Sequence, residues 1–132
     1  MSPQVDILIA DDEPAICHLL RQSLEHEGYS TRFAANGPET LAAVERAPPD
    51  LILLDIYLPG MSGIEVLREL QRRAGGELQF GVIVITATGK ESVLEEALRV
   101  GASDILTKPI DLNYLRLVVR TQLTLKPPRK GH

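Results

Sequence analysis

Residues 51–55 read Leu-Ile-Leu-Leu-Asp, four aliphatic side chains followed at once by a carboxylate. A run of this length predicts a strand that is buried on both faces. Similar runs occur at Val5–Ala10, at Val82–Ile85 and, more weakly, at Asp104–Leu106, and the half-apolar stretch Ser30–Ala34 is a further candidate. The sequence therefore predicts five short strands.

Between and after these runs lie segments in which apolar residues recur at helical spacing. Pro or Asp stands near most of their starts and Gly or Pro follows their ends, and these residues are typical start and stop signals of helices. We expect helices at Pro14–Glu27, Pro38–Ala47, Ile64–Arg73, Glu91–Val100 and Asp111–Leu125. Alternating strands and helices predict the α/β class, with a five-stranded parallel sheet covered on both faces. A closed barrel needs eight such units, so the sheet is expected to be open and doubly wound.

Length and composition fit one globular domain, because 132 residues, 44% of them hydrophobic and 24% charged, are typical of one domain. We expect this domain to span residues 1–125, followed by a flexible, basic and proline-rich tail at 126–132. The formal net charge of −4 and the lack of a basic stripe argue against direct contact with nucleic acid.

No apolar run approaches the ~20 residues of a membrane helix, and the N-terminus has no signal-peptide pattern. The single cysteine, Cys17, excludes an internal disulfide and a cysteine-based zinc site. We expect a cytoplasmic protein without a membrane partner.

Polar side chains directly follow four of the five expected strands. Asp11 and Asp12 follow the first, Asp55 the third, Thr86 the fourth and Lys108 the fifth. Ligands of doubly wound sheets bind outside the carboxyl ends of the strands, so we expect these residues to meet at one rim.

The residue types indicate phosphoryl chemistry. Crowded carboxylates repel one another unless they are protonated or hold a cation, and an all-oxygen set suits Mg²⁺. A lysine ammonium beside them attracts phosphate oxygens, a carboxylate can attack phosphorus, and Thr86 can donate a hydroxyl hydrogen bond.

Each residue also has an ordinary structural interpretation. Asp11 and Asp12 can cap the helix that begins at Pro14, Thr86 can simply end a strand, and Lys108 can be a solvated surface lysine. Asp55 is harder to explain in this way, because it comes well before the next helix and a lone buried carboxylate is costly. The shared position of all five residues favours the functional interpretation.

Four segments together resemble the receiver domains of two-component response regulators, and the resemblance extends from Val5 to Leu125. They are residues 7–13 (ILIADDE), 55–63 (DIYLPGMSG), 85–87 (ITA) and 101–109 (GASDILTKP). Each motif alone is modest, but the four in this order and spacing are specific. The resemblance implies a flavodoxin-like three-layer α/β/α fold with sheet order 2-1-3-4-5.

The resemblance also implies a Mg²⁺ site. Asp12 is expected to bind the ion directly and Asp11 mainly through water. Asp55 and the backbone carbonyl of Tyr57 are the other expected ligands.

For the phosphoryl group, the resemblance implies that Asp55 is the acceptor and that Lys108 pairs first with Asp55 and then with the phosphoryl group. Thr86 is expected to move toward a phosphoryl oxygen, which the backbone N–H of Ala87 helps to hold. The bond between Lys108 and Pro109 is expected to be cis.

Three positions are expected to tune or transmit the switch. Ile105 stands where the family usually has an aromatic residue, so the usual aromatic relay is absent. Tyr57 and Thr88, two residues after Asp55 and Thr86, flank the phosphoryl position. We hypothesise that the bulky Tyr57 slows hydrolysis of the phosphoaspartate.

The chain is thus expected to be a signalling phosphoacceptor rather than an enzyme, although it assists its own phosphorylation and dephosphorylation. Its expected partners are a sensor histidine kinase or phosphotransfer protein, a fused or separate output domain, and a second copy in a phosphorylation-dependent homodimer. An aspartate-nucleophile phosphatase is one alternative, but Tyr57 occupies the position of its usual second aspartate. A pseudo-receiver is another, although the acids and the lysine that such proteins lose are present.

Overall fold

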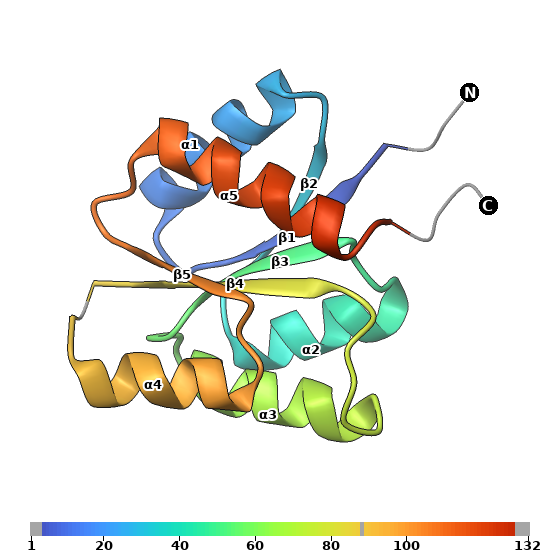
Figure 1. Ribbon diagram of the computed structural model, residues 1–132, viewed down its shortest axis with the longest axis vertical. Coiled ribbons are helices and arrows are strands. Elements are labelled where there is room, and N and C mark those ends of the chain that lie inside the picture. Colours follow the sequence, from blue (N-terminus) through green and yellow to red (C-terminus); the bar gives the residue numbers. More distant parts are fainter. Residues whose placement is uncertain (1–3, 88, 129–132) are drawn as a thin grey trace.

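The computed structural model describes residues 4–87 and 89–128, and its elements alternate throughout (Figure 1). The strands are β1 (Asp6–Ala10), β2 (Ser30–Ala34), β3 (Leu51–Asp55), β4 (Gly81–Thr86) and β5 (Asp104–Thr107). The helices are α1 (Pro14–His26), α2 (Gly37–Arg46), α3 (Gly63–Arg73), α4 (Glu91–Val100) and α5 (Leu112–Leu125). All ten expected elements are present.

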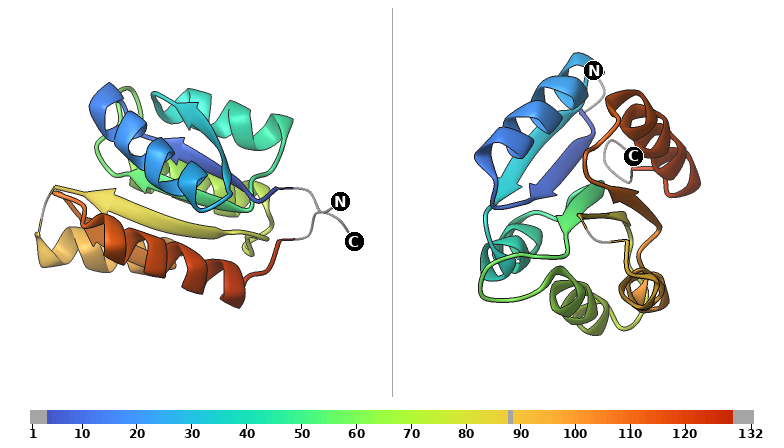
Figure 2. Two further views of the ribbon diagram at one scale, coloured as in Figure 1. Left: turned by 90° about the horizontal axis from the view of Figure 1, so that it is seen from above. Right: turned by 90° about the vertical axis from the view of Figure 1, so that its left-hand side faces the viewer.

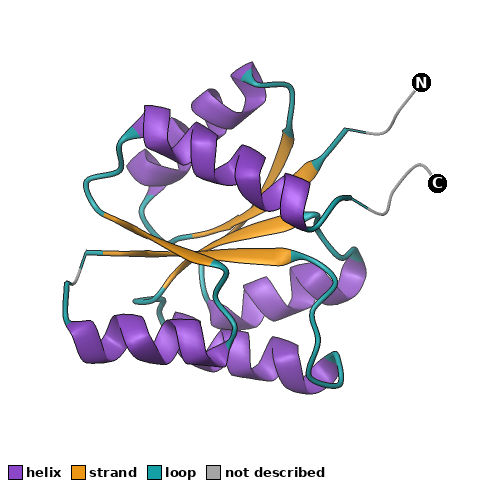
Figure 3. Cartoon of the chain, viewed as in Figure 1, coloured by secondary structure: helices purple, strands orange, loops and turns teal. Residues whose placement is uncertain are grey.

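The strands form one parallel sheet in the order β2-β1-β3-β4-β5, as expected. Helices α1 and α5 cover one face, and α2, α3 and α4 cover the other (Figures 1 and 3). The views from above and from the side show the same three layers (Figure 2). The chain is therefore a doubly wound α/β/α sandwich.

The alternation of side chains along the central strands divides the core into two clusters. Ile7 and Ile9 of β1 point to the α1/α5 side, whereas Leu8 points to the opposite side, and all three are fully buried. In β3, Leu51–Leu54 are also fully buried, because helices cover both faces of the sheet. Burial of this kind fixes the strand register, since a one-residue slip would exchange the two faces.

The first residues of α2, α3 and α5 each differ from the expected helix start by one residue, and in all three helices an N-cap residue marks the observed start. Asp111 is not the first residue of α5 but its N-cap, and its carboxylate accepts from the N–H groups of Asn113 and Tyr114. Asn36 and Ser62 cap α2 and α3 in the same way. Capping residues lie just outside the helix they stabilise.

After α5, the Nζ of Lys126 donates to the carbonyl oxygen of Leu78 at 2.9 Å. The expected division into a domain ending at residue 125 and a flexible tail stays a prediction, and residues 129–132 lie outside the described part. Within the described ranges, no helix is both long and apolar enough to cross a membrane.

Candidate functional site

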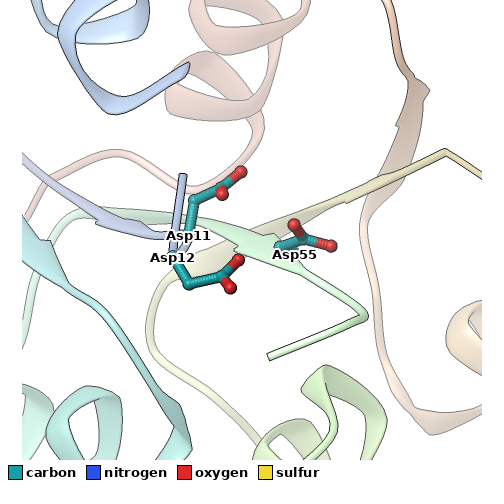
Figure 4. A group of neighbouring side chains, drawn as sticks. All are labelled: Asp11, Asp12 and Asp55. Atoms are coloured by element: carbon teal, nitrogen blue, oxygen red, sulfur yellow. The ribbon is translucent and has the colours of Figure 1, made fainter. Parts of the chain in front are cut away.

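The acidic residues expected at the rim meet at the carboxyl edge of the sheet (Figure 4). Asp11 and Asp12 follow β1, and Asp55 is the last residue of the neighbouring strand β3. One carboxylate oxygen from each lies within 4.8 Å of the others. The parallel pairing of β1 with β3 brings together residues that are far apart in the sequence.

Lys108 follows β5 and reaches this acidic group from the other side. Its Nζ lies 2.9 Å from Oδ2 of Asp55, 3.2 Å from Oδ2 of Asp11 and 2.8 Å from Oε1 of Glu13. Burial alone would lower the pKa of Lys108, but the hydrogen bonds to Glu13 and Asp55 and the nearby Asp11 outweigh it and raise the pKa. The lysine is therefore a permanent cation among three carboxylates.

Asp11 is the most buried of the acids around Lys108, with a side chain only 1% exposed. Its Oδ1 accepts from the N–H of Glu13 at 2.9 Å. Its buried Oδ2 accepts no well-aligned hydrogen bond from the described residues, despite the nearby Lys108 ammonium. Burial is the main reason that the pKa of Asp11 is raised, and the bond from Glu13 and the Lys108 cation oppose it.

The helix-capping interpretation of Asp11 is wrong in this structure. The N-cap of α1 is Glu13, whose side chain makes no capping hydrogen bond. Asp11 instead accepts from the N–H of Glu13, before the helix begins, and Asp12 is exposed. Both acids are thus available to the rim.

The loop after β3 is held close to Asp55. Oδ1 of Asp55 accepts from the N–H of Tyr57 at 2.9 Å, and the Tyr57 side chain is exposed. Gly63 permits this tight path, because a Cβ there would lie 2.3 Å from the carbonyl oxygen of Asp55. The N–H of Gly63 donates to the carbonyl oxygen of Ile56 at 2.7 Å, which closes the loop.

The remaining expected residues lie around the ends of β4 and β5. Thr86 is fully buried at the end of β4, and Ala87 beside it is exposed. Ile105 packs against the cluster beneath α2, α3 and α4. The peptide bond between Lys108 and Pro109 is cis, as expected. Thr88 lies outside the described residues.

The donor set fits a hard divalent cation. It consists of carboxylate oxygens with no cysteine or histidine, which is the preference of Mg²⁺. The buried Oδ2 of Asp11 accepts no well-aligned hydrogen bond from the described residues, and a bound cation would add to the partial compensation that the Lys108 ammonium gives it at 3.2 Å. The rim can therefore hold a metal.

Glu13 is the residue whose role sequence reasoning missed. It lies beside Asp12 at the same strand end, yet its contact with Lys108 joins residues 95 positions apart. The only available signal was its place at the rim, which is weak because acids are common before helices.

An open α/β sheet with an acidic pocket and a lysine at its carboxyl edge defines a class of domains that bind or accept phosphoryl groups. Residues 7–120 match the family model of the response regulator receiver domain. The chain therefore belongs to the receiver domain family of two-component response regulators.

Relatives and solved structures agree with this assignment. The chain is 39% identical over 120 residues to sporulation initiation phosphotransferase F of Bacillus subtilis, spanning 91% of this chain and 94% of that protein. It is 41% identical over 103 residues to the alkaline phosphatase synthesis transcriptional regulatory protein PhoP of the same species, spanning 78% of this chain but 42% of that protein.

A CheY-like receiver domain structure from Methanospirillum hungatei matches with a TM-score of 0.87 and 31% identity. The match covers 94% of this chain and 97% of that one. Family membership makes the chain a signalling module rather than a classical enzyme, with histidine kinases or phosphotransfer proteins as the partner class. Neither the phosphatase nor the pseudo-receiver alternative is favoured by these similarities.

Proposed function

We propose that Asp55 is the residue that accepts the phosphoryl group. The observation that carries this proposal is the position of its carboxylate, which lies at the end of β3, close to two other aspartates and 2.9 Å from the Lys108 ammonium. Its side chain is 5% exposed, so it is protected yet lies at the rim where a donor can approach.

In the proposed reaction, an oxygen of Asp55 attacks the phosphorus of a phosphohistidine or a small acyl phosphate. A new P–O bond forms while the bond to the leaving group breaks, and the leaving group takes the electron pair. Water later attacks the phosphoaspartate, which returns the carboxylate and releases inorganic phosphate. Lys108 pairs with the phosphoryl oxygens, and the Thr86 hydroxyl and Ala87 N–H hold another.

Asp11, Asp12, Asp55 and the Tyr57 carbonyl are the proposed Mg²⁺ ligands, with Asp11 acting mainly through water. When bound, Mg²⁺ would neutralise charge that develops on the phosphoryl oxygens. The buried Oδ2 of Asp11 and the all-carboxylate pocket support this assignment.

The consequence of phosphorylation is a change of partner surface. In phosphoaspartate, the phosphoryl group carries about −1.5 to −2 charge near neutral pH in place of the single carboxylate charge, and Thr86 and Lys108 would reorganise around it. Ile105 replaces the usual aromatic relay, so we propose that the signal passes through its packing against the cluster beneath α4. A particular kinase, a fused or separate output domain, a homodimer and a cytoplasmic location stay predictions.

The test is the intact mass of the protein after incubation with acetyl phosphate, with and without Mg²⁺, beside an Asp55→Asn control. We expect one phosphate adduct that requires Mg²⁺, is released by hydroxylamine and is missing from Asp55→Asn. If wild type forms no adduct and binds no Mg²⁺, the chain is a pseudo-receiver and the proposal fails. Turnover of a small phosphate ester would instead indicate a phosphatase.

A further inference from the structure

The Lys108 ammonium has one more anionic partner than the proposed reaction uses. Asp55 is the proposed acceptor and Asp11 a proposed metal ligand, but Glu13 has no part in the chemistry. Nevertheless, Glu13 makes the shortest contact of the three, at 2.8 Å. Its side chain is 57% exposed, so it lies on the solvent side of a lysine that is only 13% exposed.

The position of Glu13 in α1 does not account for this contact. Glu13 is the N-cap of the helix, where Ser, Thr, Asp and Asn are preferred, and its carboxylate caps nothing. Stability does not account for the contact either, because a pair whose carboxylate is more than half exposed is screened by solvent and contributes little to stability. The carboxylate is directed at Lys108, the cation on which the incoming phosphoryl group depends.

We propose that Glu13 restrains the phosphorylation of Asp55 by occupying Lys108. This inference rests on the proposed function. The Glu13 carboxylate competes with an incoming anionic donor for the same ammonium, and its own charge repels that donor at the entrance of the site. Phosphorylation then requires the donor to displace Glu13 from Lys108.

A charge-neutral, nearly isosteric variant tests the proposal. In Glu13→Gln we expect phosphorylation by acetyl phosphate, a dianion near neutral pH, to be about twofold to fivefold faster at physiological ionic strength. At 1 M salt, where the Debye length falls to ~3 Å, the part of the acceleration due to repulsion of the donor at a distance should vanish, whereas the part due to the 2.8 Å contact with Lys108 should remain. Phosphoramidate, which carries less net negative charge, should show a smaller acceleration.

The matched control is Glu25→Gln. Glu25 lies near the other end of α1, where it pairs with Arg21 at 3.4 Å and accepts from the hydroxyl of Thr31 at 2.8 Å. Twelve residues of helix separate it from Glu13, which is roughly 18 Å at ~1.5 Å per residue. At physiological ionic strength this exceeds the Debye length of ~8 Å twofold, so the control should leave the rate unchanged.

The ion pair between Glu13 and Lys108 can also be followed by NMR, without a metal or a phosphoryl donor. In Mg²⁺-free buffer, the side-chain ammonium protons of Lys108 should exchange with water faster in Glu13→Gln than in wild type. Their NMR signal is assigned by its loss in Lys108→Arg. Glu25→Gln should leave this exchange unaltered.

The inference is overturned if Glu13→Gln is phosphorylated at the wild-type rate or more slowly, or if Glu25→Gln is accelerated equally. A slower Glu13→Gln would mean that Glu13 supports Lys108 instead of competing for it. These outcomes differ from failure of the proposed function, in which wild type itself forms no adduct.

Discussion

Replacing Asp11 with asparagine is expected to raise the free energy of unfolding in metal-free buffer. At an effective dielectric constant of ~20, the charge of Asp11 gains about 5 kcal/mol from Lys108 at 3.2 Å. Repulsion between this charge and an Asp55 oxygen costs at least about 3.5 kcal/mol, because the two oxygens lie within 4.8 Å of each other. The remaining attraction, at most about 1.5 kcal/mol, is smaller than the several kcal/mol that desolvating a buried carboxylate costs.

We therefore expect Asp11→Asn to be about 2 kcal/mol more stable than wild type in EDTA, measured by urea denaturation. Added Mg²⁺ should reverse the order. A ligand at 100 times its Kd stabilises the folded state by about 2.7 kcal/mol, and the variant should lose most of that gain. If Asp11→Asn is less stable than wild type in EDTA, the reasoning that the buried charge of Asp11 destabilises the metal-free fold is refuted.

The same variant has a defined pH dependence. Burial raises the pKa of Asp11 above its ordinary value of 3.8, so its charged form destabilises the fold. That penalty is absent below the unfolded pKa, grows as the pH rises from the unfolded to the folded pKa and is fully present above the folded pKa. The stability advantage of Asp11→Asn in EDTA should accordingly shrink as the pH is lowered from 7 toward 4. An advantage that grows on acidification would contradict this assignment.

Three further substitutions test other parts of the site and fold. Gly63→Ala should lower the free energy of unfolding by about 3 kcal/mol in urea denaturation, because its Cβ would meet the carbonyl oxygen of Asp55 at 2.3 Å. Asp111→Ala should lower it by about 1 kcal/mol through loss of the α5 cap, whereas a loss near zero would mean that the cap is dispensable. Tyr57→Ala should lose phosphate several-fold faster after removal of the donor, followed by intact mass, and an unchanged rate would exclude shielding by this side chain.

The fold could be predicted from the sequence because local and global signals agree. The run at Leu51–Leu54 is apolar at every position, and a run this short is typical of a strand covered on both faces. The half-apolar β2 was the weakest prediction, since it is an edge strand that pairs with β1 alone. The structure confirms the strand, which pairs with β1 from Ser30 to Ala34.

The site could be predicted in outline but not in its contacts. Topology alone places Asp11, Asp55 and Lys108 at one rim, since each follows a strand of the same parallel sheet. Sequence reasoning could not decide which of the neighbouring acids is buried. Asp11 is buried and Asp12 is exposed, and the turn in which the Glu13 N–H donates to Asp11 has no unambiguous sequence signature.

Lys108 connects these observations, because the same ammonium serves three carboxylates with different tasks. In the metal-free state its ammonium lies 3.2 Å from a carboxylate oxygen of Asp11 and 2.9 Å from one of Asp55, so it offsets part of the repulsion between these two buried acids. A cation bound by the acids would take over that task and leave the ammonium available to phosphoryl oxygens. Under the two proposals made above, Glu13 would then be the remaining competitor for it, and the balance between Glu13 and the donor would set how readily Asp55 is modified. Electrostatic strain in the pocket and restraint of the reaction are thus two consequences of one arrangement of charges.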